Sequence, residues 1–221
     1  MLDLIVNGGG LIAPALTAQL ERSSHEVHAV GMPNGEGAGI RDHFERIARS
    51  GQRYNNVFID LTHGFNELEV FNADAPRALA ELECRIKGML SVLKYGAQHL
   101  MRAAGGRIWV LCIDHSVSMS VSSASNPVTN YAAMAAVRCL AKEVLHFAVM
   151  VNLFMIHPPR ESVDAAEWKG AKTNLDPYAL RYKPQPADHL CETLHLYSEL
   201  RNLTTSGALI PLGAGIAIAN I

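Results

Sequence analysis

The stretch from residue 2 to residue 20, LDLIVNGGGLIAPALTAQL, decides the fold class of this chain. An apolar run from Leu2 to Val6 leads into three consecutive glycines, and Pro14 then precedes two leucines spaced four residues apart. Proline suits the first turn of a helix, because its missing N–H would have no partner there, and the leucine spacing is helical. We therefore expect a buried strand, a glycine turn and a helix.

The same alternation continues to the end of the chain. Strands are predicted within residues 25–30, 56–61, 107–113, 147–156 and 207–212, and helices over residues 40–49, 75–102, 130–146 and 187–200. Strands that alternate with helices are typical of a doubly wound parallel sheet. Because no linker or repeat interrupts the pattern, we predict one Rossmann-like α/β domain over residues 1–221, with residues 158–185 as a crossover or lid segment.

Composition narrows the classes of partner. The net charge is −2, with 19 basic against 21 acidic residues, so no basic surface for nucleic acid stands out. The apolar run over residues 147–156 is much shorter than the roughly 20 residues that span a bilayer. The N-terminus lacks the pattern of a signal peptide, and the four cysteines are too far apart for a C-x-x-C motif. We expect a cytoplasmic protein that binds neither nucleic acid nor membrane.

Six short stretches, in the expected order, resemble motifs of the short-chain dehydrogenase/reductase family, and especially its 3-oxoacyl-carrier-protein reductases. They are Val6-Asn7-Gly8, Arg85-Ile86-Lys87-Gly88, Gly105-Gly106-Arg107-Ile108, Asn130-Tyr131-Ala132-Ala133, Val151-Asn152 and Ser206-Gly207-Ala208-Leu209-Ile210-Pro211. The resemblance implies the family's Rossmann-like sheet, an NAD(P) cofactor, and pairing of subunits through two long helices, here residues 75–102 and 130–146. Those helices are intact and apolar.

The family's catalytic residues are only partly present. The resemblance places Tyr131 on the tyrosine of the Tyr-x-x-x-Lys motif, but Ala135 stands where the lysine is expected and Arg85 where an asparagine is expected. Without a nearby cation, a phenol with a pKa of about 10 is a poor acid or base at neutral pH. Three serines, Ser116, Ser118 and Ser120, compete for the family's serine role, in a segment over residues 114–129 that we predict to be a loop.

The cofactor site also departs from the family pattern. Aligned without gaps, Ile12 and Pro14 fall on the second and third glycines of the family's phosphate-binding turn. Residues 31–56 have room for a loop and one helix only, so we predict a sheet one strand shorter than the standard fold. We expect no cofactor. NAD(P) is the alternative, and Asn7, Gly8 and Gly10 are then the residues expected to contact it.

Polar residues follow three successive predicted strands. They are His63, the run Asp114-His115-Ser116, and His157. Because ligands of open parallel sheets bind outside the carboxyl ends of the strands, these residues and Tyr131 are candidates for a cofactor-free acid/base site, with a histidine oriented by Asp114. Polar capping of strand ends is the alternative interpretation. We expect no metal, because no two of these histidines are closely spaced in sequence.

Three functions follow from these features. The first is a catalytically degenerate partner subunit that assembles, as a homo-oligomer or with a paralogue, around a carbonyl or 3-oxoacyl reductase. The second is a cofactor-independent lyase, isomerase or cyclase acting on a small carbonyl or acyl-thioester compound. The third is a divergent NAD(P)-dependent oxidoreductase. Fold alone does not choose among them.

Overall fold

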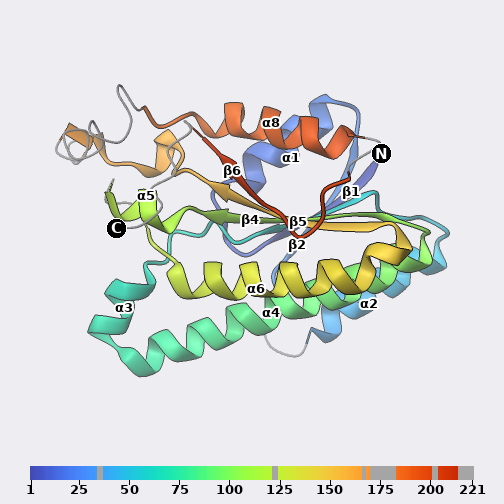
Figure 1. Ribbon diagram of the computed structural model, residues 1–221, viewed down its shortest axis with the longest axis horizontal. Coiled ribbons are helices and arrows are strands. Elements are labelled where there is room, and N and C mark those ends of the chain that lie inside the picture. The colour runs from blue at the N-terminus through green and yellow to red at the C-terminus, as the bar shows by residue number, and fades with distance from the viewer. Residues whose placement is uncertain (34–36, 121–123, 166–167, 170–182, 201–203, 214–221) are drawn as a thin grey trace.

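The computed structural model describes residues 1–33, 37–120, 124–165, 168–169, 183–200 and 204–213. These residues form a six-stranded sheet in which every neighbouring pair is parallel, in the order β2-β1-β3-β4-β5-β6 (Figure 1). The strands are β1 (Leu2–Asn7), β2 (Glu26–Gly31), β3 (Asn56–Asp60), β4 (Gly106–Ile113), β5 (Val149–Ile156) and β6 (Leu209–Leu212). The predicted Rossmann-like doubly wound sheet is confirmed.

Among the described residues no strand lies outside β2, so the strand that the sequence predicted to be missing between residues 31 and 56 is absent there. In the usual order 3-2-1-4-5-6, a further strand lies outside the second one. Here β2 is the edge of the sheet, and the chain passes through α2 (Ala38–Arg49) directly to β3. The direction of travel across the sheet therefore reverses between β1 and β3.

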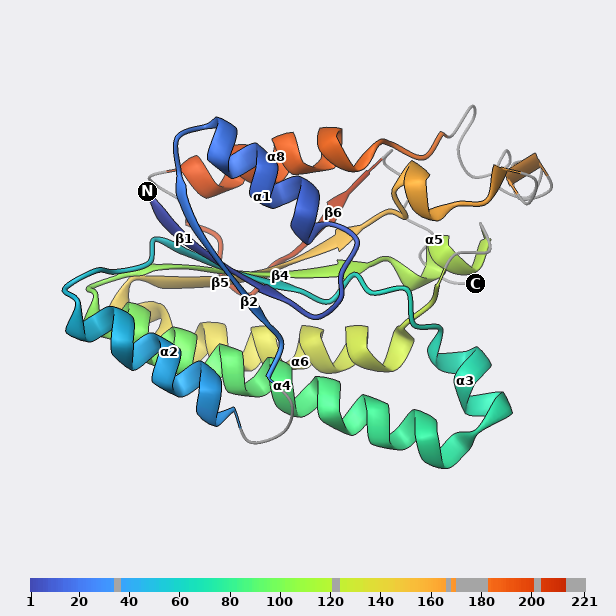
Figure 2. The same cartoon turned by 180° about the vertical axis from the view of Figure 1, so that it is seen from behind.

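Helices cover both faces of the sheet (Figures 1 and 2). Helices α1 (Ala13–Arg22) and α8 (Ala187–Glu199) lie on one face, and α2, α4 (Ala75–Arg102) and α6 (Pro127–Val144) lie on the other. Successive strand residues point to opposite faces, so Ile5 packs with the first group and Leu4 with the second. Among the described helices, none is both long enough and apolar enough to cross a membrane.

Two short helices were not predicted from the sequence. Helix α3 (Glu67–Ala73) begins where the side chain of Asn66 accepts a hydrogen bond from the Glu69 N–H at 3.3 Å. Helix α5 (His115–Ser120) follows Asp114, whose carboxylate accepts from the Ser116 N–H. The predicted loop over residues 114–129 was therefore wrong, because local side-chain capping offsets the unsatisfied N–H groups of a short helix.

The predicted crossover or lid over residues 158–185 lies mostly outside the described residues. Its described ends are tied together. The N–H of Arg160, at the start of the 3-10 turn Arg160–Ser162, donates to the Gln185 carbonyl at 2.9 Å, and the N–H of Ala187 donates to the Glu161 carboxylate at 3.1 Å. The two described ends of the segment therefore lie next to each other.

Candidate functional site

The crevice of this fold lies at the carboxyl ends of β1 and β3, where the strand order reverses. Asn7 ends β1 and Asp60 ends β3, and the two residues are direct neighbours in the sheet register. The N-terminus of α1 opens over the same point. In a nucleotide-binding member of this fold class, the backbone N–H groups of this turn face the pyrophosphate.

In this chain the N-terminus of α1 is already occupied by the carboxylate of Asp60. Its Oδ2 accepts a hydrogen bond from the Ala13 N–H at 2.6 Å, and its Oδ1 accepts from the N–H and the hydroxyl of Thr62 at 2.8 and 2.6 Å. The residue is fully buried. Burial raises the pKa of Asp60, and the hydrogen bonds from Thr62, Ala13 and Ile12 oppose that rise.

Gly10 makes room for this carboxylate. A Cβ atom at Gly10 would lie 2.1 Å from the Asp60 carboxyl group, closer than any real side chain approaches. The third glycine of the GGG turn is therefore required for contact within the chain, because only a residue without a side chain leaves the space that Asp60 fills.

All N–H groups from Gly8 to Ala13, the segment we call loop 8–13, have acceptors within the chain. They are the Asp60 carbonyl for Gly8, the Asn7 side chain for Gly9 and Gly10, the Thr62 hydroxyl for Leu11 and Ile12, and the Asp60 carboxylate for Ala13. Pro14 has no N–H to offer. In this arrangement loop 8–13 does not fit a pyrophosphate, since its donors are used and a buried carboxylate stands at the helix terminus.

A small hollow of about 300 Å³ remains beside the loop, between the ends of β1 and β2 and helix α4. Met32 follows β2, and its side chain lies against two glycines. A Cβ atom added at Gly8 or Gly88 would lie 3.4 or 3.0 Å from it. Arg85 pairs with Glu81 at 2.7 Å, and its guanidinium lies 5.1 Å from the Phe65 ring centroid. The volume is at the lower end of the range for ligand pockets.

Helix α6 buries the residue that precedes the predicted tyrosine. Tyr131 is 60% exposed, whereas Asn130 is fully buried and donates to the Ile113 carbonyl at the end of β4 at 2.6 Å. Four residues on, Met134 packs against the core and Ala135 is exposed. The inward positions with Tyr-x-x-x-Lys spacing are thus Asn130 and Met134, which offer neither a phenol nor an ammonium group.

His115 is the one candidate histidine that meets Tyr131. Their ring centroids are 5.3 Å apart, and the Nδ1 of His115 lies 3.3 Å from the Asn130 side-chain nitrogen. The carboxylate of Asp114 accepts hydrogen bonds from Ser116, from the hydroxyl at 2.6 Å and the N–H at 3.0 Å. Among the described residues, no hydrogen bond joins it to His115. Asp114 therefore caps α5.

His63 and His157 are both buried and have different hydrogen-bond partners. His63 accepts a hydrogen bond from the Phe65 N–H at 3.3 Å, and burial together with the charge of Arg85 lowers the pKa of His63 to about 3. It is neutral at physiological pH. His157 donates its backbone N–H to the Leu212 carbonyl at 2.8 Å. Within the described part of the chain, the three strand-end histidines do not form a metal-binding cluster.

Two buried acidic residues that were not predicted from the sequence accept hydrogen bonds at helix N-termini. One is Asp60. The other is Glu67, whose carboxylate accepts from the N–H groups of Val128 at 2.7 Å and Thr129 at 3.1 Å, at the start of α6. Asp60 was detectable, because an aspartate two residues before Thr62 at a strand end is typical of a side-chain-capped turn. Glu67 was not, since its partners are about 60 residues away in the sequence.

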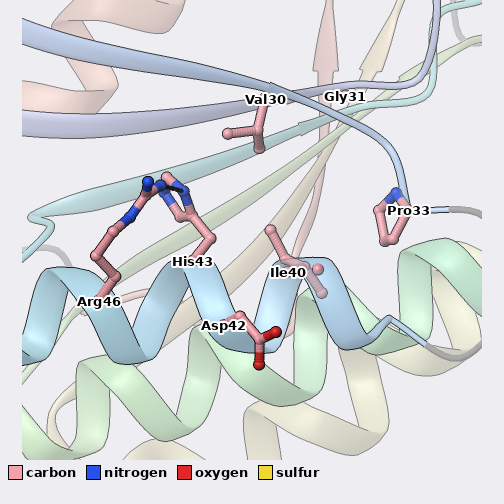
Figure 3. Close-up of a pocket in the computed structure, with 8 residues that line it drawn as sticks. Val30, Gly31, Pro33, Ile40, Asp42, His43 and Arg46 are labelled. Carbon is pink, nitrogen blue, oxygen red and sulfur yellow. Dashed lines mark hydrogen bonds between the residues drawn. The ribbon is translucent and has the colours of Figure 1, made fainter.

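A second hollow lies at the edge of the sheet that β2 forms. Figure 3 shows it between the exposed edge of β2 and helix α2, with Ile40, Asp42, His43 and Arg46 rising from the helix below Val30 and Pro33. Its volume is about 430 Å³. It lies where the additional strand of the standard fold would pair with β2.

This chain has the fold of the short-chain dehydrogenases/reductases. It is similar to a short-chain dehydrogenase from Leptospira borgpetersenii solved with bound NAD⁺, with a TM-score of 0.75 and 11% identity over 97% of this chain and 91% of that one. It is also similar to NAD⁺-bound xylitol dehydrogenase (TM-score 0.72, 12% identity, 97% and 98% covered) and to a short-chain dehydrogenase/reductase from Mycobacterium ulcerans (TM-score 0.71, 14% identity, 95% and 87% covered). No family model and no curated protein matches the sequence.

Proposed function

We propose that this protein is a catalytically degenerate partner subunit, which assembles with a carbonyl or 3-oxoacyl reductase of the same fold and uses no nicotinamide cofactor itself. The observation that carries the proposal is the carboxylate of Asp60 at the N-terminus of α1, in the place where neighbours of this fold carry their nucleotide. The absence of a phenol and an ammonium group at Asn130 and Met134 supports it further.

The partner role rests on the outer face of α4 and α6. A groove of about 560 Å³ runs between these helices, lined by Leu90 and Met101 of α4 and Leu140 of α6. Leu90 is 47% exposed and lines the groove with the partly buried Met101 and Leu140, so the three side chains form an apolar patch on the surface. Lys94 and Glu143 line the same groove from opposite helices, so a two-fold related subunit would place opposite charges against each other.

Calorimetric titration with NADPH and NADH tests the first part of the proposal. We expect no heat of binding for either nucleotide with the wild-type chain, and a standard reductase of this fold serves as the positive control. Binding of one equivalent per chain would contradict the proposal and support the divergent reductase instead.

Light scattering after mixing with a purified 3-oxoacyl reductase from the same organism tests the partner role. We expect a complex of defined stoichiometry that Leu90→Glu on α4 abolishes. Leu196→Glu is the matched control, because Leu196 is 64% exposed on α8, on the opposite face of the sheet. If the two variants behave alike, or no complex forms, the partner role is wrong.

The contact between His115 and Tyr131 favours the cofactor-independent enzyme as a second candidate. An imidazole beside an exposed phenol can move a proton at the α-carbon of a carbonyl compound. Exchange of the α-protons of a 3-oxoacyl thioester in D₂O, followed by NMR, tests this activity. Catalysed exchange that His115→Ala abolishes and His189→Ala retains would favour the enzyme over the partner subunit.

A further inference from the structure

We infer that the protein has a binding site for a divalent transition-metal ion of the zinc class, formed by His25, His195 and Glu199. This site lies at the amino ends of the strands, at the opposite end of the sheet from the crevice. His25 precedes β2, and the other two residues lie on the last turns of α8, beside the start of the chain (Figures 1 and 2). It is independent of the proposed function.

The three side chains have ligand geometry. Their ligand atoms all lie within 4.8 Å of one another. The Nε2 of His25 is 2.8 Å and the Nε2 of His195 is 4.0 Å from the same Glu199 oxygen. Two ligands of a tetrahedral zinc ion, each about 2.1 Å from the metal, are about 3.4 Å apart. Shifts of about 0.5 to 1.5 Å in these atoms, within reach of side-chain rotation, would bring all three onto one ion.

The main observation in favour of a metal is the environment of His195. Its Nε2 atom is inaccessible to solvent and has no hydrogen-bond partner among the described residues. A buried imidazole nitrogen without a partner costs free energy, and here it faces two other potential ligands. His195 and Glu199 are four residues apart on α8, so both project from the same side of the helix.

Asp3 prepares His25 for metal binding. Its carboxylate lies 2.5 Å from the Nδ1 of His25, and its other oxygen accepts from the Asn56 side chain at 2.8 Å. A carboxylate that accepts the Nδ1–H of a histidine fixes the tautomer whose Nε2 has a lone pair for a metal. Asp3 is fully buried and the His25 side chain is 5% exposed, so both are held in place.

Charge around the cluster also suits a cation. The carboxylates of Asp3 and Glu199 both act on the guanidinium of Arg107, which donates to the carbonyls of Ser198 and Leu200 at the end of α8. Hydrogen bonds between His25 and the two carboxylates would still leave the Nε2 of His195 without a partner among the described residues.

The metal would join the end of α8 to the turn before β2. Glu199 is 41% exposed, so the fourth position of a tetrahedral ion faces solvent and takes water. Because the ligands come from both ends of the sequence, the ion would tie α8 to the first strands and stabilise the folded state.

Zinc binding by the full-length chain, stripped of metal by a chelator and dialysed, tests the site. We expect one equivalent of Zn²⁺ to bind in competition with a chromophoric chelator, and one equivalent of Co²⁺ to give the visible bands of a four-coordinate site. His195→Ala and Glu199→Gln should weaken binding by more than about 100-fold, and Asp3→Asn by about 10- to 100-fold. Zinc should raise the midpoint of thermal unfolding of the wild type, but not that of His195→Ala or Glu199→Gln.

His189→Ala and Glu192→Gln are the matched controls, since both residues are exposed on the same helix. They should bind zinc as the wild type does. The inference is overturned if the stripped wild-type chain binds no zinc, or if His195→Ala and His189→Ala bind it equally. Circular dichroism of each variant without metal verifies that a loss of binding is not a loss of fold.

Discussion

The carboxylate of Asp60, at the end of β3, accepts a hydrogen bond of 2.6 Å from the backbone N–H of Ala13, in the first turn of α1. The two residues are 47 positions apart in the sequence. A negative charge at a helix N-terminus is favourable, because it compensates both the free N–H groups and the helix dipole. The chain thus places one of its own carboxylates at the helix terminus that binds the pyrophosphate in nucleotide-binding Rossmann folds.

Replacing Asp60 with alanine should destabilise the protein by about 3 kcal/mol, because it leaves several buried N–H and O–H donors without an acceptor. Urea unfolding followed by circular dichroism measures the loss. Asp42→Ala, an exposed aspartate on α2, is the control and should change the free energy of unfolding by less than about 0.5 kcal/mol. Equal effects of the two substitutions would contradict the assigned role of Asp60.

Replacing Gly10 with alanine should cost at least about 2 kcal/mol, since the new methyl group would overlap the Asp60 carboxyl group. Gly39→Ala, on the exposed side of α2, meets no atom within 4 Å and should be neutral or slightly stabilising. In an Asp60→Ala background the cost of Gly10→Ala should fall by more than about 1 kcal/mol. An unchanged cost in that background would show that the two residues are not coupled.

Stability should fall as the pH is lowered below about 6.5. The pKa of His63 is lowered to about 3 by burial and by Arg85, so between these values the unfolded chain binds a proton that the folded chain does not. This histidine contributes a slope of up to about 1.4 kcal/mol per pH unit. Burial also lowers the pKa of His99 and His43, which act in the same direction.

Unfolding of His63→Asn at pH 7, 6, 5 and 4 isolates that contribution. Its free energy of unfolding should vary less steeply with pH than that of the wild type, whereas the exposed His189→Asn should follow the wild type. A parallel pH dependence in all three proteins would show that His63 is protonated in the folded state.

Ala135→Lys should not create a reductase. The side chain at residue 135 is exposed, on the same outward side of α6 as Tyr131. The double variant Asn130→Tyr/Met134→Lys places a phenol and an ammonium group on the buried side of α6. It should also remain inactive, because the N–H groups of loop 8–13 are already bonded within the chain. NADPH oxidation with a 3-oxoacyl thioester is the assay, and measurable turnover by either variant would contradict this expectation.

The purified chain should be a dimer or larger in solution, held through the groove between α4 and α6. Size-exclusion chromatography with light scattering gives the mass. A wild-type monomer would remove the main support for the partner role unless the reductase complex forms. Leu90→Glu should reduce the mass to that of a monomer, because it buries a charge in an apolar interface.

Most of the fold was predictable from local sequence patterns. The strand from Leu2 to Val6, the long helix over residues 75–102 and the missing strand within residues 31–56 were all correct, because apolar periodicity and segment length are local properties. The short helices α3 and α5 were missed. They form because Asn66 and Asp114 cap them, and a single capping residue is a weaker signal than a run of periodic ones.

The sequence by itself determined that this is a doubly wound sheet with a short edge, and that the residues expected for nucleotide chemistry are altered. Only the tertiary structure decided which side chains are buried and which residues meet at these positions. It buried Asn130 and left Tyr131 exposed, placed Asp60 at the start of α1, and brought His25 next to His195. Periodicity encodes which face of an element is buried, but the partners that meet across 47 or 170 residues are fixed only when the elements pack, because side-chain contacts depend on register and distance.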